Sequence, residues 1–243
     1  MCGTCGCSSP DAATAHDQAF GGDRVIALER DLLAKNDAVA ARNRERLAKT
    51  DTTCVNVVSG PGAGKTTLLV ATLKRLRAEL ACAVVGGDQA GELDATRVRA
   101  TGVPAAQLNT GKACHLDAQM IAGALDRGIA PAGGLLFIEN VGNLMCPAGF
   151  DLGENARVVV AAVTDGDDKP LKYPDIFATA ELVLVTKIDL RPYVAFDLER
   201  FTAHVRRVRP DAVIVAVSAV TGAGLEAWLD WLARLCVRRR AVA

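Results

Sequence analysis

The stretch from Cys54 to Thr67, CVNVVSGPGAGKTT, constrains the fold of this chain more than any other segment. An apolar and β-branched run leads into a glycine-rich turn, and an apolar helical run, Leu68 to Leu80, follows the turn. This order predicts a strand, a phosphate-binding loop and a helix. A loop that wraps a phosphate with its backbone N–H groups needs small side chains or none, and the glycines of the turn meet that need.

The turn supplies the groups that nucleotide phosphates require. Lys65 places a point charge near the β- and γ-phosphates, and the hydroxyl of Thr66 suits Mg²⁺. Ser59 departs from the P-loop pattern, because it stands where the first glycine usually lies. A glycine-rich turn without a ligand is the alternative, but the strand before the loop and the helix after it favour nucleotide binding. The predicted nucleotide-binding residues of the loop are Gly60, Gly62, Ala63, Gly64, Lys65, Thr66 and Thr67.

The composition is that of a globular protein. Of the 243 residues, 50% are hydrophobic, which is enough for one substantial α/β domain and a small appendage. Lysine plus arginine equals aspartate plus glutamate, at 28 each, so the net charge favours neither a nucleic acid nor an anionic membrane as a partner. No apolar run approaches the ~20 residues of a membrane span, and the N-terminus lacks the order of a signal peptide. We therefore expect a cytoplasmic location.

The first seven residues, MCGTCGC, place the thiols of Cys2, Cys5 and Cys7 close to one another. Thiolates at this spacing chelate soft or borderline metals, and backbone or amine nitrogens can complete a square-planar site that suits Ni²⁺. A thiol-redox role is the alternative. Residues 8–22 are small, polar and aperiodic, so they predict a flexible linker after this metal-binding tail.

The rest of the chain, residues 23–243, reads as one domain. Apolar residues at helical spacing predict a long amphipathic helix from Asp23 to about Lys49, and a closing helix from Gly224 to about Arg240. Apolar runs predict strands at residues 54–58, 82–85, 135–138, 157–163, 182–185 and 213–217. Residues 164–177, TDGDDKPLKYPDIF, are predicted to form a polar loop. This order predicts an α/β fold of the P-loop NTPase type, a doubly wound, mainly parallel sheet flanked by helices.

Acidic residues follow two of the predicted strands. Asp88 comes shortly after the second strand and Glu139 directly after the third, at the edge where nucleotides bind in doubly wound sheets. We expect both to organise Mg²⁺ and the attacking water, with Lys65 as the third catalytic residue. Gly142 would let its N–H approach the γ-phosphate. Asp94 can reach the same centre, although a charge on a helix surface is the alternative. The predicted magnesium ligands are Thr66, Asp88, Asp94 and Glu139.

The segment Thr186-Lys187-Ile188-Asp189 predicts recognition of guanine. The Asp189 carboxylate can accept hydrogen bonds from N1 and N2 of the base, and the stem of Lys187 can lie over its ring. Backbone N–H groups of Ser218 and Ala219, after the sixth strand, can reach O6. GTP is therefore favoured over ATP. The usual first residue of this box is asparagine, and Thr186 in its place is expected to weaken hydrogen bonds within the loop.

Of the three histidines in the chain, His115 is the one that lies beside a cysteine. Cys114 and His115 are adjacent, and Cys146 follows Gly142 by four residues. The three side chains can bind Zn²⁺ or Ni²⁺ if folding brings them together, and Cys146 would then respond to the nucleotide state. Adjacent ligands need a local loop to face one ion, and a capping or packed histidine is the alternative. The remaining cysteines, expected to be inert core residues, are Cys54, Cys82 and Cys236.

Several segments together resemble the HypB family, SIMIBI-class P-loop GTPases of the G3E group that help to deliver nickel to nickel–iron hydrogenase. The segments are MCGTCGC, SGPGAGKTT, the pair Cys114-His115, ENVGNLMCP, DGDDKPLKYP and TKIDL. They occur in the family's order and extend over nearly the whole chain, so the combination is specific where each motif alone is not.

The resemblance implies a GTPase that forms a homodimer on binding GTP and inserts or delivers Ni²⁺ during hydrogenase maturation. Slow intrinsic hydrolysis is expected, since the sequence offers no obvious catalytic arginine or glutamine. The implied ligand sets are Cys2, Cys5 and Cys7 for an N-terminal nickel site, and Cys114, His115 and Cys146 for a second site at the dimer interface. Two subunits that share the second set would also remove the geometric objection to adjacent ligands. The implied partners are a HypA-like nickel donor and the precursor of the hydrogenase large subunit.

Three alternatives remain at this stage. Chaperone GTPases of urease or cobalamin enzymes are close relatives in function, and the MCGTCGC tail argues against both. A passive nickel-binding protein that uses nucleotide only as a structural ligand is a second alternative. A redox role of Cys2 and Cys5 is the third, and it predicts activity after nickel has been removed.

Overall fold

The computed structural model describes residues 14–88 and 92–242. The chain divides into two compact units, residues 1–35 and residues 36–243. Helix α1, Thr14–Lys49, begins in the first unit and ends in the second. The tail cysteines, Cys2, Cys5 and Cys7, lie outside the described residues, so their metal site stays a prediction.

The start of α1 differs from the prediction. The helix begins at Thr14 rather than Asp23, so the part of the expected linker from Thr14 to Gly22 is helical. Alanine and glutamine are good helix formers, and the helix continues through Gly21 and Gly22 despite a cost of about 1 kcal/mol for each glycine. The linker prediction was wrong for this segment, because small and polar residues do not by themselves exclude a helix.

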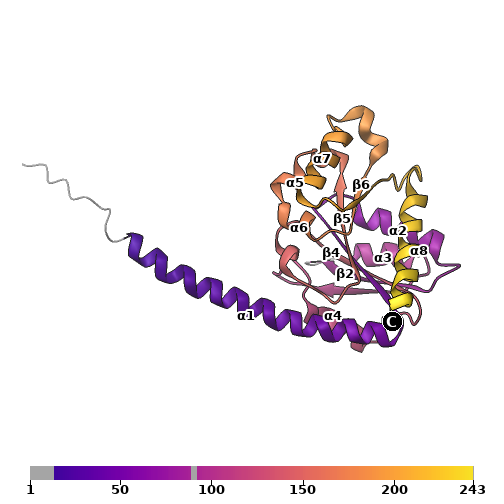
Figure 1. Cartoon of the computed structure of the whole chain (residues 1–243). Helices are drawn as coiled ribbons and strands as arrows, with labels where there is room; N and C mark the ends of the chain where they lie inside the picture. Colours follow the sequence, from indigo (N-terminus) through magenta and orange to yellow (C-terminus); the bar gives the residue numbers. More distant parts are fainter. Residues whose placement is uncertain (1–13, 89–91, 243) are drawn as a thin grey trace, which may run out of the picture. The chain divides into compact units, whose positions relative to one another are not determined.

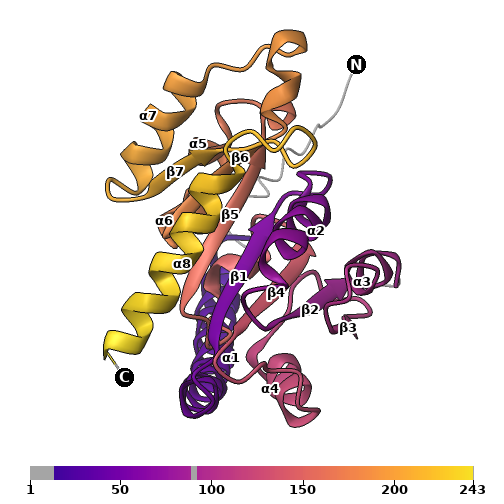
Figure 2. The same cartoon turned by 90° about the vertical axis from the view of Figure 1, so that its right-hand side faces the viewer.

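Seven strands form one parallel sheet with the order β3-β2-β4-β1-β5-β6-β7 (Figures 1 and 2). The strands are β1 Thr53–Ser59, β2 Cys82–Asp88, β3 Ala105–Asn109, β4 Leu135–Gly142, β5 Ala156–Ala162, β6 Leu182–Thr186 and β7 Val213–Ala216. The strand that enters the P-loop, β1, lies between β4 and β5. The carboxyl ends of the central strands therefore meet around the loop, as a doubly wound sheet requires.

Two parts of the sheet domain were not predicted from sequence. Strand β3 carries the sequence AAQLN and is only half-buried at the sheet edge, so neither an apolar run nor strict alternation marks it. Its pairing with β2 makes it a strand. Residues 164–177, predicted to be a polar loop, instead form short helical turns, because two prolines occupy first-turn positions where a missing N–H costs nothing.

Helices cover both faces of the sheet, which confirms the predicted fold class. The α-helices after α1 are α2 Lys65–Leu76, α3 Leu93–Arg99, α4 Ala118–Asp126, α5 Lys169–Lys172, α6 Pro174–Ala178, α7 Leu198–Val208 and α8 Leu225–Val242. The 3-10 turns are η1 Cys146–Gly149, η2 Val163–Asp165 and η3 Ile188–Tyr193. Side chains of α2, α3 and α8 share one core with Val55 and Val57 of β1. Those of α4, α6 and α7 pack on the opposite face (Figure 2).

The three cysteines predicted to be core residues are buried: Cys54, Cys82 and Cys236. Burial raises the pKa of the Cys82 thiol to about 11, so this thiol is protonated and unreactive at neutral pH. Among the described residues, no helix combines the length and the apolar character needed to cross a membrane.

Candidate functional site

The phosphate loop links the end of β1 to the start of α2, with its shape fixed by two glycines. Gly62 and Gly64 have φ angles of 73° and 92°, a conformation that residues with a side chain rarely adopt. Ser59, the departure from the motif, is fully buried and accepts a hydrogen bond from Lys65 Nζ at 2.8 Å. The serine hydroxyl therefore holds the Lys65 ammonium group close to the end of β1.

The predicted Mg²⁺ ligands converge beside the loop. Thr66 Oγ1 donates to Glu139 Oε1 at 2.6 Å, although the two residues belong to α2 and β4. Asp88, at the end of β2, and Asp94, on α3, line the same cavity. These side chains offer only oxygen atoms, the donors that a hard cation such as Mg²⁺ prefers, so the residues present fit this ion.

Burial shifts the pKa values of Glu139 and Lys65, in each case toward the uncharged form. Glu139 is only 6% exposed, and burial raises the pKa of its carboxyl, although Thr66 and Lys65 oppose the shift. Burial also lowers the pKa of Lys65, against the attraction of nearby carboxylates. Both shifts come from lost hydration of the charged forms. A bound Mg²⁺ ion would add positive charge beside Glu139, and the nucleotide phosphates would add negative charge beside Lys65.

We expect Glu139→Gln to raise the thermal stability of the nucleotide-free protein at pH 7 to 8. The folded protein binds a proton at Glu139 more tightly than the unfolded chain does. The protonated carboxyl therefore stabilises the folded state, and this contribution is fully present below the unfolded-state pKa near 4.5. It is lost as the pH rises through the folded-state pKa. The neutral amide avoids this loss and still accepts from Thr66. A gain of about 1 kcal/mol would raise the unfolding midpoint by about 2–4 °C.

Thermal unfolding with and without GTP and Mg²⁺ measures this effect. The wild type should gain more stability than the variant on addition of Mg²⁺ and nucleotide. A variant that melts below the wild type without ligand at pH 7 to 8 would show that the buried carboxylate is favourable on balance.

The cavity around the loop measures about 470 Å³. Its wall includes Arg97 of α3, whose Nη2 donates to Thr67 Oγ1 at 3.1 Å and whose Nη1 lies 3.4 Å from Asp94. Arg97 was missed from sequence, although its position three residues after Asp94 on one helix could have signalled it. Gly142 lies against the loop as well, since an added Cβ would come within 3.0 Å of the Cα atom of Pro61. The nucleotide contact of Gly142 stays a prediction.

The predicted base-recognition residues lie together at the other end of the loop. The Asp189 carboxylate accepts a hydrogen bond from the hydroxyl of Ser218, which joins two segments that are distant in sequence. The same hydroxyl accepts from the backbone N–H groups of Val220 and Thr221. Lys187 has a positive φ of 59°, and its Nζ donates to the carbonyl of Gly62 at 2.7 Å. These contacts fix the carboxylate and the lysine stem in place before a base binds.

Thr186 joins the base-recognition segment to the phosphate loop. Its buried hydroxyl donates to the carbonyl of Ala63 at 2.7 Å. The threonine hydroxyl can form this bond because β6 brings it close to the loop. The expected weakening of hydrogen bonds within the TKID segment stays a prediction.

A second cluster of ligand atoms lies on the described part of the chain. Cys114 Sγ donates to Cys146 Sγ at 2.6 Å and lies 3.7 Å from Nδ1 of His115. One ligand atom from each of the three residues lies within 4.8 Å of the others. All three side chains are half-buried, which leaves an approach for an ion.

One chain brings these ligands together, so sharing between subunits is not needed to overcome the adjacency of Cys114 and His115. The pair lies in the loop between β3 and α4, which gives it the local turn that adjacent ligands need. The N-cap of α4 is Asp117, which accepts from Met120 N at 2.8 Å, so His115 is not a capping residue. Cys146 begins the 3-10 turn η1.

The protonation of this cluster follows from its contacts. The hydrogen bond to Cys146 raises the pKa of the Cys114 thiol. Burial lowers the pKa of His115, so its imidazole is neutral at physiological pH. Neutral imidazole and thiolate sulfur suit Zn²⁺, Ni²⁺ and Cu²⁺. Metal binding must therefore release the thiol protons.

Comparison with known proteins agrees with this geometry. A family model described as "CobW/HypB/UreG, nucleotide-binding domain" matches residues 54–216. "Hydrogenase maturation factor HypB" of Escherichia coli K12 is 53% identical over 220 residues, which cover 90% of this chain and 76% of that protein. The protein of the same name from Azotobacter chroococcum is 51% identical, with 91% of this chain and 73% of that protein covered.

Two crystal structures have a similar fold. The hydrogenase maturation factor HypB of Archaeoglobus fulgidus superposes with a TM-score of 0.79 at 41% identity and covers 84% of this chain and 99% of its own. The structure of HypB from Helicobacter pylori in complex with nickel has a TM-score of 0.79 at 38% identity. It covers 84% of this chain and 96% of its own. Each of these two crystal structures thus shares its fold with 84% of this chain.

Proposed function

We propose, because this chain belongs to the HypB family of hydrogenase maturation factors, that it is a GTP-hydrolysing metallochaperone that delivers Ni²⁺ during the maturation of nickel–iron hydrogenase. The nucleotide is GTP, selected by Asp189 and Lys187. The cargo is Ni²⁺, bound by Cys114, His115 and Cys146, where Zn²⁺ is the competing ion. The cytoplasmic location expected from the sequence stays a prediction.

In the nucleotide site, most of the groups that bind the phosphates and stabilise their charge belong to the chain itself. The glycine-rich loop offers backbone N–H groups to the phosphates, and Lys65 stabilises charge on the oxygen atoms of the transferred group. Mg²⁺, held by Thr66, Glu139, Asp88 and Asp94, would neutralise phosphate charge when bound. Glu139 or Asp88 orients the attacking water. Slow intrinsic turnover is expected, because Arg97 is half-exposed and pairs with Asp94 rather than pointing as a free cation at the phosphates.

The nickel site offers two thiolates and an imidazole, a set that binds Ni²⁺ tightly after the thiols lose their protons. The Helicobacter pylori relative is described in complex with nickel, which supports nickel as the cargo of this chain. The predicted tail site, Cys2, Cys5 and Cys7, would receive or hold a second ion.

One continuous segment carries the proposal. Near its carboxyl end, β4 carries the buried Glu139, which bonds to Thr66 of the nucleotide site, and the chain reaches the proposed metal ligand Cys146 seven residues later. A loss of the γ-phosphate relaxes the segment from Glu139 to Gly142 and shifts Cys146 relative to Cys114. The altered ligand set releases Ni²⁺ to an acceptor. Transfer of metal, not of phosphate, is the useful result.

Assembly follows the same logic. GTP binding favours a homodimer, and the metal site lies near that interface. A HypA-like protein supplies the nickel, and the precursor of the hydrogenase large subunit receives it. These partners are inferred from the family, and sequence identity over most of the chain supports the inference.

We expect the affinity for Ni²⁺ at the Cys114 site to be about 5-fold or more higher with a non-hydrolysable GTP analogue and Mg²⁺ than with GDP, within the usual range of allosteric coupling. A full-length variant with serine at positions 2, 5 and 7 isolates this site, and competition with a chromophoric chelator measures the affinity. Cys146→Ser is the matched control, because it should remove most of the binding in both states. Equal affinities in the two nucleotide states would refute the coupling.

A further inference from the structure

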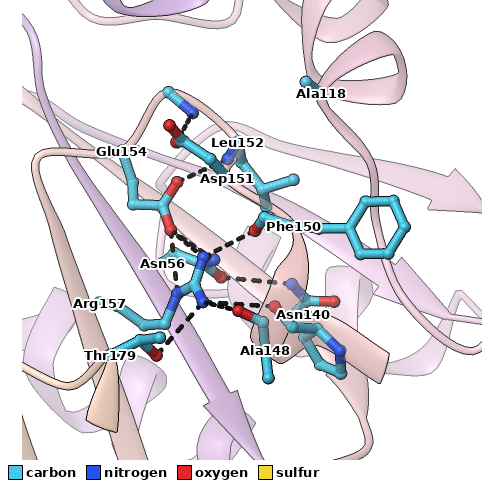
Figure 3. Close-up of polar contacts among 12 residues, drawn as sticks. Asn56, Ala118, Asn140, Ala148, Phe150, Asp151, Leu152, Glu154, Arg157 and Thr179 are labelled. Carbon is cyan, nitrogen blue, oxygen red and sulfur yellow. Dashed lines mark hydrogen bonds and ion pairs between the residues drawn. The ribbon is translucent and has the colours of Figure 1, made fainter. Parts of the chain in front are cut away.

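A buried ion pair lies beside the metal cluster and takes no part in the proposed chemistry. Arg157 of β5 and Glu154 have side chains only 8% and 7% exposed, and Arg157 Nη2 lies 2.8 Å from Glu154 Oε1 (Figure 3). Desolvation largely offsets the attraction of such a pair, so the pair is a weak source of stability. The other donors of the guanidinium point to a more specific role.

Those donors hold the segment that carries Cys146. Arg157 Nη1 donates to the carbonyl of Ala148 at 3.0 Å and to that of Pro147 at 3.3 Å, and Nη2 donates to the carbonyl of Phe150 at 2.6 Å. Figure 3 shows these bonds converging on one guanidinium from the turn that follows the ligand. A planar group with fixed donors can hold several carbonyls of one turn in a single arrangement.

The same arginine reaches the second ligand segment through Phe150. The rings of Phe150 and His115 pack with centroids 4.0 Å apart at an angle of 39°. Because Arg157 fixes the carbonyl of Phe150, it also fixes the surface against which the imidazole rests. The orientation of His115 thus depends on a side chain in the strand behind it.

A chain of amides links this arrangement to β4. Glu154 Oε1 accepts from Asn56 Nδ2 at 3.0 Å, and Asn56 Oδ1 accepts from Asn140 Nδ2 at 3.4 Å. Asn140 Oδ1 in turn accepts from the backbone N–H of Leu116 at 3.1 Å, next to His115. Asn140 directly follows Glu139 in β4. The strand that bears the proposed Mg²⁺ ligand is therefore tied to both ligand segments.

We propose that Arg157 is a positioning residue for the metal cluster: it holds the Cys146 turn and Phe150 so that Cys114, His115 and Cys146 present their ligand atoms together. The inference rests on the proposed nickel-binding function of these three residues. Arg157 lies beside Asn56 in the sheet, at the middle of β1, whereas the phosphate loop begins after Ser59 at the end of that strand. The guanidinium therefore acts on the metal site and does not contact the nucleotide.

Arg157→Lys tests this role in the full-length chain with serine at positions 2, 5 and 7. Lysine keeps the charge that pairs with Glu154 but cannot hold three carbonyls in one plane. We expect the affinity for Ni²⁺ to fall by about 10-fold or more, the loss reported for residues that orient metal ligands. The thiolate-to-nickel charge-transfer band should weaken or shift, because Cys146 is no longer fixed. The affinity for GDP should stay within about 2-fold of wild type, a difference of less than about 0.5 kcal/mol.

Arg44→Lys is the matched control. Arg44 lies on the other side of the same loop region, where it is half-exposed and forms a two-bond ion pair with Asp151. Its guanidinium bonds to Asp151, whereas that of Arg157 bonds to the Cys146 turn, so replacement of Arg44 should change neither the nickel affinity nor the spectrum.

The results separate the inference from the function on which it rests. Wild-type protein that binds no Ni²⁺ at Cys114 and Cys146 would refute the proposed function. Wild-type protein that binds Ni²⁺ while folded Arg157→Lys binds it with the same affinity and spectrum would refute the positioning role alone. If Arg157→Lys does not fold, Phe150→Leu decides, because it keeps the carbonyl for Arg157 and removes the ring from His115. A weaker nickel affinity then supports the inference, and unchanged affinity overturns it.

Discussion

Lys65→Ala is expected to reduce GTP hydrolysis by about 10²–10³-fold, the usual loss when a preorganised charge donor at a reacting centre is removed. Lys65 lies in the phosphate loop with Nζ 2.8 Å from Ser59 Oγ, where its charge can reach the β- and γ-phosphates. Burial lowers the pKa of this lysine, so it is a group that needs the phosphates as partners. Its removal should leave the nucleotide-free protein folded. Single-turnover release of phosphate measures the effect.

The control for this prediction is Lys74→Ala, which removes an exposed lysine from the same helix. It should hydrolyse GTP at the wild-type rate. The same pair of variants separates a chaperone driven by hydrolysis from a passive nickel-binding protein. Cells whose only copy of the protein is Lys65→Ala are then assayed for hydrogenase activity. If that activity survives although GTP hydrolysis is lost, the protein is a passive nickel-binding protein and the proposed function is wrong.

Asp189→Asn is expected to exchange the base preference of the site. In the proposed binding mode the Asp189 carboxylate accepts from two nitrogens of guanine, and each hydrogen bond to a charged group contributes about 1.5–3 kcal/mol. The side-chain amide of asparagine instead turns an N–H group toward a guanine nitrogen that is also a hydrogen-bond donor. The affinity for GTP should therefore fall by about 10²–10⁴-fold. Xanthosine triphosphate carries a carbonyl where guanine has its amino group, and it should bind the variant better than GTP does. Competition against a fluorescent nucleotide compares the two.

Asp211→Asn is the matched control, because it makes the same substitution at an exposed residue that pairs with Arg209 on the surface. Its preference for GTP should be unchanged. Retention of GTP affinity by Asp189→Asn would mean that the base lies elsewhere, even though Ser218 holds Asp189 in place. Guanine recognition would then have to be assigned to other residues.

The fold was largely predictable from local patterns. The P-loop and the apolar runs identified six of the strands. Strands β1, β5 and β6 are buried throughout, as parallel strands covered on both faces are, and therefore appear as continuous apolar sequence. Strand β3 escaped because its sequence, AAQLN, is half-exposed at an edge. The start of α1 was placed too late, since a short polar segment gives no local sign that a helix will extend through it.

The candidate site was predictable in part. Lys65, Thr66 and Glu139 were placed from motif spacing, and Thr66 and Glu139 meet at 2.6 Å. The contact of Thr186 could not be predicted in this way. Its hydroxyl bonds to the carbonyl of Ala63, which is 123 residues away along the chain. This bond depends on where β6 lies in the sheet, and no local pattern records that.

The sequence by itself determined that this chain has a phosphate loop, a base-recognition segment and a family resemblance, because each of these depends on residues that are adjacent along the chain. Only the tertiary structure decided that Cys114 and Cys146, 32 residues apart, come within 2.6 Å of each other in one chain. It also decided that Arg157 holds the turn that begins at Cys146. Contacts of this kind form only when separate strands and loops pack together, and the spacing of residues along the chain does not show which segments become neighbours.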